Sequence, residues 1–341
     1  MSLIGKARMR ILVAVSLLLL STPVLLAGAM YWSLQQPLEL GDAPGTVELP
    51  RGTSLDRLAV TIHERGWMSG ADALALRIYG RLTGEASRMQ AGEYLVEPGA
   101  TPLTLLRQIV SGQVIQYRLT IVEGWTFQRV IEELGRHPAV EQTLFGMSDE
   151  EIMAELGYEG RHPEGRFYPS TYQFPRGTPD RRILQRAYRR MERRLDEIWA
   201  RRKPDLPLDS AYEALILASI VERETGVPEE RRRVAGVFTR RLEQGMRLQT
   251  DPTVIYGLEE ELEDRLRTRH LRTDTPYNTY TRHGLPPTPI AMPGSAAIEA
   301  AVDPEPGDVL YFVSRGDGSH HFSATLEEHN RAVRRYILGQ E

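Results

Sequence analysis

An uncharged, mostly aliphatic run from Ile11 to Trp32 constrains the fold of this chain more than any other feature of its sequence. Roughly 22 residues in an α-helix, at about 1.5 Å each, would cross a hydrocarbon core of about 30 Å. Tyr31 and Trp32 end the run, where an aromatic belt lies at a membrane surface. Pro23 lies inside it, and membrane helices tolerate proline. The sequence therefore predicts one transmembrane helix over residues 11–32.

The charges on either side of this run predict its orientation. Three basic residues occur within the first ten positions, whereas no Lys or Arg follows the run before Arg51. By the positive-inside rule, residues 1–10 form a cytoplasmic tail and the rest of the chain is exported. A cleaved signal peptide is the alternative, because Ala27-Gly-Ala29 is similar to a cleavage site. Its apolar region would exceed the usual length of about 7–15 residues, so we expect a retained anchor.

The composition is that of an ordinary globular domain. The chain has no cysteine, so its exported part must be stabilised by its own core and not by disulfides. About 300 exported residues suffice for that, in about two domains. A content of 41% hydrophobic and 26% charged residues is typical of folded proteins. The net charge of -4 gives no indication of a nucleic-acid partner.

One local pattern occurs three times after a polar tether at residues 33–46. Each copy is a short strand, a glycine turn, a Ser or Thr helix cap and an amphipathic helix. The turns contain Gly52, Gly99 and Gly124, and their uneven spacing indicates a recurring unit and not a solenoid. Strand–helix units of this kind resemble LysM modules, the small sugar-binding domains of cell-wall proteins. We therefore expect a small LysM-like α+β module over residues 47–135; a plain structural unit would show the same pattern, and a spacing role is favoured over glycan binding.

A long helix is predicted from Arg181 to Lys203, because its apolar residues recur at steps of three and four. The opposite face carries several arginines, which could contact anionic lipid or an acidic polymer. Acidic residues lie among those arginines, so a solvated face is the favoured interpretation. The apolar residues are Leu184, Tyr188, Met191, Leu195 and Ile198.

A second helix carries the candidate chemistry. It is capped by Asp209 or Ser210 and runs to about Thr225, and residues 214–221 are apolar all round, which indicates a buried helix. Glu222 and Glu224 follow in its last turn, on nearly opposite faces.

Two effects would raise the pKa of Glu222 above the usual value for a carboxyl group. Desolvation by the apolar helix disfavours the charged form, and so does the negative end of the helix dipole. A carboxyl group that stays protonated near neutral pH can donate a proton to a glycosidic oxygen. The alternative is that the helix reaches the surface after Val221 and that both glutamates are solvated, paired with Arg223 or with residues 231–233.

A polar segment follows at Leu248–Gly257. Asp251-Pro252 predicts a turn or cap at the start of a helix. Gln249 and Thr250 are uncharged hydrogen-bonding groups that suit sugar hydroxyls and acetamides.

Taken together, these segments resemble the MltG/YceG-like endolytic murein transglycosylases of bacteria. The likeness covers essentially the whole chain, and its motifs occur in a fixed order. Two blocks depart from the family pattern. In Glu164–Tyr172, Ser170 replaces the usual acid, which leaves any role of that acid in doubt. In His321–Thr325, Ser323 and Ala324 differ from the family. The matching blocks are Glu164–Tyr172, Ala218–Thr225, Val234–Phe238 with Arg241-Leu242, Gly245–Gly257, Tyr277–Tyr280, Gly284–Ile290, Tyr311–Val313, His321–Thr325 and His329-Asn330.

The resemblance implies a fold, a location and an activity. It implies an α+β protein with a single helix in the bacterial inner membrane, a LysM-like module, and a larger catalytic domain at residues 136–341 outside the cytoplasm. Members of the family cut nascent peptidoglycan strands between N-acetylmuramic acid and N-acetylglucosamine and leave a 1,6-anhydro-muramyl end. The substrate is then the glycan strand, no cofactor is required, and a partner among the wall-synthesis enzymes is implied.

The resemblance also implies that Glu222 is the catalytic residue. In the mechanism that we expect, Glu222 protonates the leaving oxygen and then accepts the proton of the sugar's C6 hydroxyl as that oxygen closes on C1. Glu224 could exchange roles with it. The expected substrate-binding residues are Gln249, Thr250, Asp251, Tyr277, Asn278, Tyr280 and Glu224.

Three other interpretations stay open. One is a membrane-tethered wall-binding scaffold without activity. Another is a muramidase that uses water and pairs Glu222 with Asp251 or Glu164. A metal site at His320, His321 and His329 is disfavoured, because no HExxH or carboxylate–His spacing accompanies them.

Overall fold

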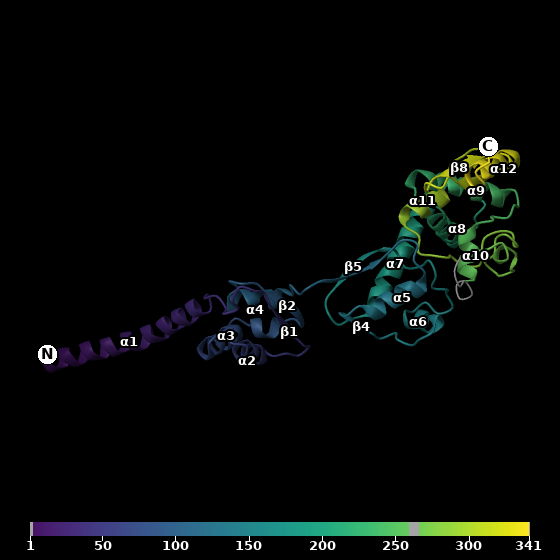
Figure 1. The fold of residues 1–341 in the computed structure, drawn as a ribbon. Helices are drawn as coiled ribbons and strands as arrows, with labels where there is room; N and C mark the ends of the chain where they lie inside the picture. The colour runs from purple at the N-terminus through teal and green to yellow at the C-terminus, as the bar shows by residue number, and fades with distance from the viewer. Residues whose placement is uncertain (1–2, 259–265, 341) are drawn as a thin grey trace. The chain divides into compact units, whose positions relative to one another are not determined.

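The computed structural model describes residues 3–258 and 266–340, which divide into two compact units, residues 1–117 and 118–341. The first unit contains α1 (Leu3–Ser33), β1 (Gly45–Leu49), α2 (Leu55–Glu64), α3 (Gly70–Leu82), the 3-10 turn η1 (Glu85–Arg88), β2 (Gly92–Val96) and α4 (Pro102–Ser111) (Figure 1).

Helix α1 contains the predicted transmembrane segment. Residues Met9–Ser33 are long and apolar enough to cross a membrane, and Pro23 lies within the helix as expected. Large aliphatic side chains such as Leu20 and Leu25 are exposed along it, whereas a helix of a soluble core would bury them. The helix therefore fits a membrane anchor, and its orientation stays a prediction.

The rest of the first unit confirms two of the predicted strand–turn–helix units. Strands β1 and β2 pair antiparallel, with Val47 opposite Tyr94, and α2, α3 and α4 bury their apolar faces in the same core. The turn after each strand contains a glycine in the left-handed region, where a side chain would be strained. Ser54 and Thr101 then cap α2 and α4, as the sequence predicts.

Among the described residues, the second unit combines three two-stranded pairs with eight α-helices, one of which is buried all round. Strand β3 pairs with β5, β4 pairs with β6 in parallel, and β7 pairs antiparallel with β8. Its elements are β3 (Tyr117–Ile121), α5 (Phe127–Arg136), β4 (Val140–Glu141), α6 (Asp149–Glu155), β5 (Ser170–Phe174), β6 (Thr178–Pro179), α7 (Asp180–Trp199), α8 (Ala211–Glu224), η2 (Pro228–Glu230), α9 (Arg231–Glu243), α10 (Asp251–Gly257), η3 (His270–Arg272), α11 (Ser295–Val302), β7 (Tyr311–Ser314), β8 (His320–Ser323) and α12 (Leu326–Tyr336).

The third strand–turn–helix unit, β3 followed by α5, belongs mainly to this second unit. The compact division falls at residue 117, whereas the sequence pattern placed the domain boundary after residue 135. The difference arises because β3 pairs with β5, far downstream in the sequence. A local repeat cannot reveal that pairing.

Helix α8 forms the centre of the second unit's core, with α7, α9 and α11 packed against it (Figure 1). Residues 214–221 are all buried, and the Ser210 hydroxyl accepts a hydrogen bond from the Glu213 N–H, so the predicted helix and its cap are confirmed. Helix α7 buries the predicted apolar face. Two of its arginines bind neighbouring elements: Arg190 donates to the Ser170 hydroxyl at 2.9 Å, and Arg194 pairs with Glu299 at 2.8 Å.

Candidate active site

A cavity of about 470 Å³ lies at the C-terminal end of α8, within the size range of small-molecule sites. Glu224 is the last residue of α8 and lies on the wall of this cavity. The other wall residues come from α9, from the start of α10 and from the C-terminal hairpin and helix. They are Arg241, Leu248, Gln249, Asp251, Tyr280, Tyr311, Phe312, Val313, Ser314, His320, Leu326, His329 and Val333.

The Glu224 carboxyl group is held by a short hydrogen bond. The Thr250 hydroxyl donates to Glu224 Oε2 at 2.5 Å, and Thr250 itself is buried. Burial raises the pKa of Glu224; the Thr250 hydrogen bond and the charges of His320 and Arg241 oppose that rise, and the Asp251 carboxylate adds to it. The net shift is upward, so this carboxyl group stays protonated to higher pH than an exposed one.

The segment before α10 places an amide and a carboxylate on the same wall. Gln249 has a φ of +51°, in the left-handed region that a residue other than glycine adopts only at a cost. Asp251 is exposed to the cavity, and its Oδ1 accepts a hydrogen bond from the Tyr280 hydroxyl at 2.6 Å. Three predicted substrate-binding residues, Gln249, Asp251 and Tyr280, therefore lie with Glu224 around one space.

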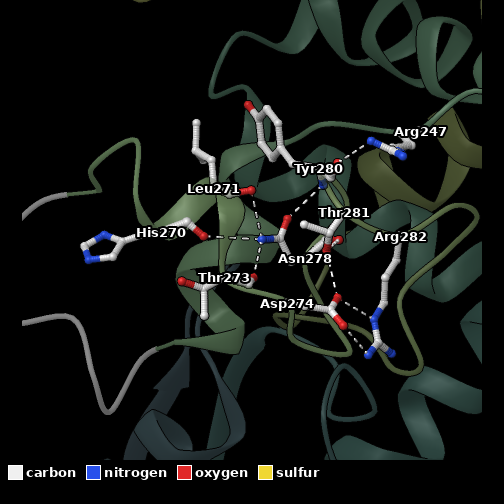
Figure 2. Close-up of polar contacts among 9 residues, drawn as sticks. All are labelled: Arg247, His270, Leu271, Thr273, Asp274, Asn278, Tyr280, Thr281 and Arg282. Atoms are coloured by element: carbon white, nitrogen blue, oxygen red, sulfur yellow. Dashed lines mark hydrogen bonds and ion pairs between the residues drawn. The ribbon is translucent and has the colours of Figure 1, made fainter.

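Asn278, also predicted to bind substrate, instead organises the segment that carries Tyr280 (Figure 2). It is fully buried, and its side-chain oxygen accepts the Tyr280 N–H at 2.8 Å. Its amide nitrogen donates to the carbonyl oxygens of His270, Leu271 and Thr273 at 3.3, 3.2 and 2.7 Å.

Tyr277 likewise lies off the cavity wall. Its hydroxyl is 2.8 Å from the Thr288 hydroxyl, and its ring packs against Tyr256 at 4.8 Å between centroids. The predicted binding residues therefore fall into three groups. Gln249, Asp251, Tyr280 and Glu224 line the cavity. Thr250 and Asn278 are hydrogen-bonded to residues of its wall, and the contacts of Tyr277 lie away from it.

Glu222 lies elsewhere and is not among the residues of the cavity wall. Its side chain is only 6% exposed; Oε2 accepts the Gly294 N–H at 2.9 Å, and Oε1 is 3.7 Å from Nη2 of Arg231. Burial raises the pKa of Glu222, the Gly294 N–H lowers it, the nearby Glu123 carboxylate raises it and Arg231 lowers it. Glu222 is therefore a buried acid of raised pKa, as the sequence predicts, but it holds the start of α11.

Glu164, the other carboxylate considered as a catalytic partner, is occupied by backbone contacts. Both of its oxygens accept the Phe127 N–H at 3.1 Å, at the start of α5, and the Tyr256 hydroxyl donates to Oε2 at 3.2 Å. It is 3% exposed, so its contacts hold α5 against the core.

The sequence interpretation did not assign Arg241, Tyr311 or the two wall histidines to the site. Arg241 is buried; its guanidinium donates to the Leu310 and Leu248 carbonyls at 2.8 and 2.7 Å and lies 5.2 Å from the centre of the Tyr311 ring. His320 Nδ1 is 2.7 Å from Glu230 Oε2. The signal that could have found Arg241, Tyr311 and His329 is their presence in the matching sequence blocks, whereas His320 lies one position before such a block. Within residues 3–258 and 266–340, no cluster of three His, Asp or Glu side chains is arranged to hold a metal ion.

The chain combines a mixed α/β unit, which has carboxyl, amide, phenol and guanidinium groups around one cavity, with an N-terminal helix that fits a membrane anchor. The chain belongs to the YceG-like family, whose model matches residues 47–335.

Two named relatives carry the same functional description. An endolytic murein transglycosylase of Bacillus subtilis is 30% identical over 92% of this chain and 91% of its own length. An endolytic murein transglycosylase of Streptococcus pneumoniae is 24% identical over 86% of this chain, which spans 58% of that relative. A crystal structure of a YceG-like protein from Listeria monocytogenes aligns with a TM-score of 0.55 at 29% identity, over 86% of this chain and all of that one.

Proposed function

We propose that this protein is an endolytic murein transglycosylase, which cuts peptidoglycan strands between N-acetylmuramic acid and N-acetylglucosamine and leaves a 1,6-anhydro-muramyl end. Family membership and the names of the two relatives support the activity. The cavity at the end of α8 supports the substrate class, because amide, phenol and carboxyl groups around a polar space suit the hydroxyls and acetamides of amino sugars.

Glu224 is the residue that we propose as acid and base. Its carboxyl group protonates the bridging oxygen as the bond from C1 of the muramyl sugar to that oxygen breaks. The resulting carboxylate then accepts the proton of the C6 hydroxyl as this oxygen bonds to C1. One residue serves both steps because the first step converts it into the base that the second requires. No water is consumed, so no second carboxylate has to activate one.

A single observation carries this assignment: Glu224 lies on the cavity wall with its pKa raised and one oxygen fixed by Thr250. The other oxygen, Oε1, can then face a substrate, while burial among the wall residues raises the pKa and favours the protonated form of Glu224. Asp251, hydrogen-bonded by Tyr280, supplies a negative charge that favours the protonated form of Glu224 and would stabilise positive charge developing at C1.

Glu222 is the second candidate for the same role. Its burial and raised pKa favour it, as does its place as the first carboxylate of the motif. Its contacts with Gly294 and Arg231 instead support a structural role at the start of α11.

Muropeptide analysis of Glu224→Gln and Glu222→Gln separates the two candidates and the rival functions. We expect Glu224→Gln to abolish anhydro-ended products while the protein stays folded, and Glu222→Gln to retain cleavage. The reverse pattern would assign the reaction to Glu222. Reducing ends would identify a muramidase that uses water, and an absence of new ends from the wild type would identify a wall-binding scaffold.

The proposed location and partners follow from the anchor and from the family. Helix α1 would hold the protein in the inner membrane, with the N-terminus in the cytoplasm and the chain after α1 outside the cytoplasm, where strands are polymerised. An enzyme of wall synthesis is the proposed partner. A LysM-like function of the first unit stays a prediction. It would be tested by comparing how much protein a peptidoglycan pull-down retains for the full chain and for a chain in which residues 1–117 are replaced by an unrelated sequence.

A further inference from the structure

A second cavity, of about 640 Å³, lies in the second unit where the end of α7, the start of α9 and α11 meet. Its wall differs from that of the candidate active site, since neither Glu222 nor Glu224 contributes to it. Basic side chains outnumber acidic ones on this wall. The basic residues are Arg201, Lys203, Arg231 and Arg232, and the acidic ones are Glu299 and Asp303.

Salt bridges already neutralise both acids, one with partners on the wall and one with a partner behind it. Asp303 binds Lys203 at 2.6 Å and Arg232 at 2.9 Å, and Glu299 binds Arg194 of α7 at 2.8 Å. Two guanidinium groups, those of Arg201 and Arg231, therefore face the cavity without an acidic partner on its wall.

Arg231 is the unusual member of this pair. Its side chain is only 15% exposed, and its Nε is buried without a hydrogen-bond partner among the described residues. Its charged partner, Glu222, is 3.7 Å away and already accepts the Gly294 N–H. The Glu222 oxygen is too far for a hydrogen bond, and burying a charged group is costly unless it is hydrogen-bonded, so the other guanidinium N–H groups of Arg231 remain available to an anion in the cavity.

We propose that this cavity is an oxyanion-binding site, in which Arg231 and Arg201 bind a carboxylate or a phosphate. Guanidinium groups bind both anions through paired N–H donors, and a planar donor fixed by its surroundings loses little entropy on binding. The source of the anion rests on the proposed function: a stem peptide of the glycan supplies carboxylates, and a lipid-linked strand supplies phosphate. In this arrangement Glu222 positions Arg231, which gives the first carboxylate of the motif a role separate from that of Glu224.

The test measures binding, not cleavage, so that its outcome is independent of the proposed activity. Full-length Glu224→Gln protein in detergent is titrated by calorimetry with inorganic phosphate, with a soluble stem peptide that has free carboxylates, and with the same peptide amidated. Binding of phosphate or of the free-carboxylate peptide supports the site and identifies the source, provided that the amidated peptide binds at least tenfold more weakly. If the Glu224→Gln protein, in which Arg201 and Arg231 are unchanged, binds none of these compounds, the proposal is overturned.

Variants locate the binding. Adding Arg231→Gln should weaken binding at least tenfold, and Arg231→Lys should weaken it less. Arg201→Gln removes an exposed side chain, so it tests the same wall if Arg231→Gln fails to fold. Arg182→Gln, on the exposed face of α7, is the matched control and should bind as the parent does. Unchanged anion affinity in both Arg231→Gln and Arg201→Gln would overturn the assignment of the binding to this cavity.

Discussion

The Thr250 hydroxyl donates a hydrogen bond to Glu224 Oε2 at 2.5 Å and so joins the residue before α10 to the last residue of α8. A hydrogen bond to a carboxylate favours its charged form, so this contact lowers the pKa of Glu224 against the effect of burial. The two opposing effects set the pH range in which Glu224 can donate a proton.

Replacing Thr250 with Val should therefore raise the pKa of Glu224. The general acid would remain protonated to higher pH, so the alkaline limb of the pH–rate profile for cleavage should move upward. Thr250→Ser keeps the hydroxyl and should leave the limb near its wild-type position. A limb that does not move in Thr250→Val would show that a group other than Glu224 sets it.

Replacing Glu224 with Gln should stabilise the folded protein at neutral pH. Because the pKa of Glu224 is raised in the folded state, its stabilising contribution is present below the pKa of the unfolded chain and is lost as the pH rises through the folded pKa. The gain from Gln should be about 1.4 kcal/mol for each unit of pKa shift, and it should vanish below about pH 4. Thermal melts at pH 7 and pH 4 measure it; an equal effect at both pH values would contradict the raised pKa.

Replacing Gln249 with Gly should separate stability from activity. Gly adopts a φ of +51° without strain, so the variant should gain about 1 kcal/mol of unfolding free energy, while loss of the amide weakens cleavage. Asp205, with a φ of +59°, is the matched control, because it lies outside the candidate active site. Asp205→Gly should be stabilised with unchanged activity. If Gln249→Gly cleaves as the wild type does, the amide does not contact substrate.

Replacing Asn278 with Ala should destabilise the segment around Tyr280 by about 2 kcal/mol, because several buried backbone groups lose their partner. Hydrogen exchange of residues 270–282 should accelerate, and activity should fall because Tyr280 no longer holds Asp251. Tyr280→Phe, which removes only the hydroxyl, should reduce activity with little change in exchange. Equal exchange in Asn278→Ala and wild type would contradict this role.

Replacing Gly294 with Ala should change the stability of the start of α11 only slightly. The backbone there is extended, with a φ of −79°, and the atom that an added Cβ would meet at 1.9 Å, Glu123 Oε1, is the end of an exposed side chain that can move aside. Gly294→Ala and Gly294→Ala/Glu123→Ala should therefore unfold at nearly the same denaturant concentration. Energetic coupling between the two substitutions would mean that the Glu123 side chain is fixed in place.

Local sequence patterns predicted the helices and their ends better than the site. The apolar residues of α7, the buried run of α8 and the Ser210 cap follow from periodicity and capping rules, which act within a few residues. Those rules place Glu222 and Glu224 on opposite faces of a helix that is buried all round. Which face meets the cavity depends on Thr250 and on residues 311–333, and no pattern within α8 records that contact.

Local sequence patterns also could not predict the roles of the residues that hold the wall in place. Asn278 and Tyr280 are neighbours in a motif of polar residues, yet one is fully buried among carbonyl oxygens and the other reaches the cavity. Arg241 lies in an amphipathic helix whose pattern gives no sign that its guanidinium would turn inward to the Leu248 and Leu310 carbonyls.

The cavity wall has a consequence for biosynthesis. Leu326, His329 and Val333 follow every other wall residue along the chain, so the ribosome must pass residue 333 before the pocket can close. If α1 is the anchor that we propose, the chain reaches the membrane before the pocket is complete. A polypeptide that ends prematurely after α11 would lack α12 and, under the proposed function, could not cut the cell wall.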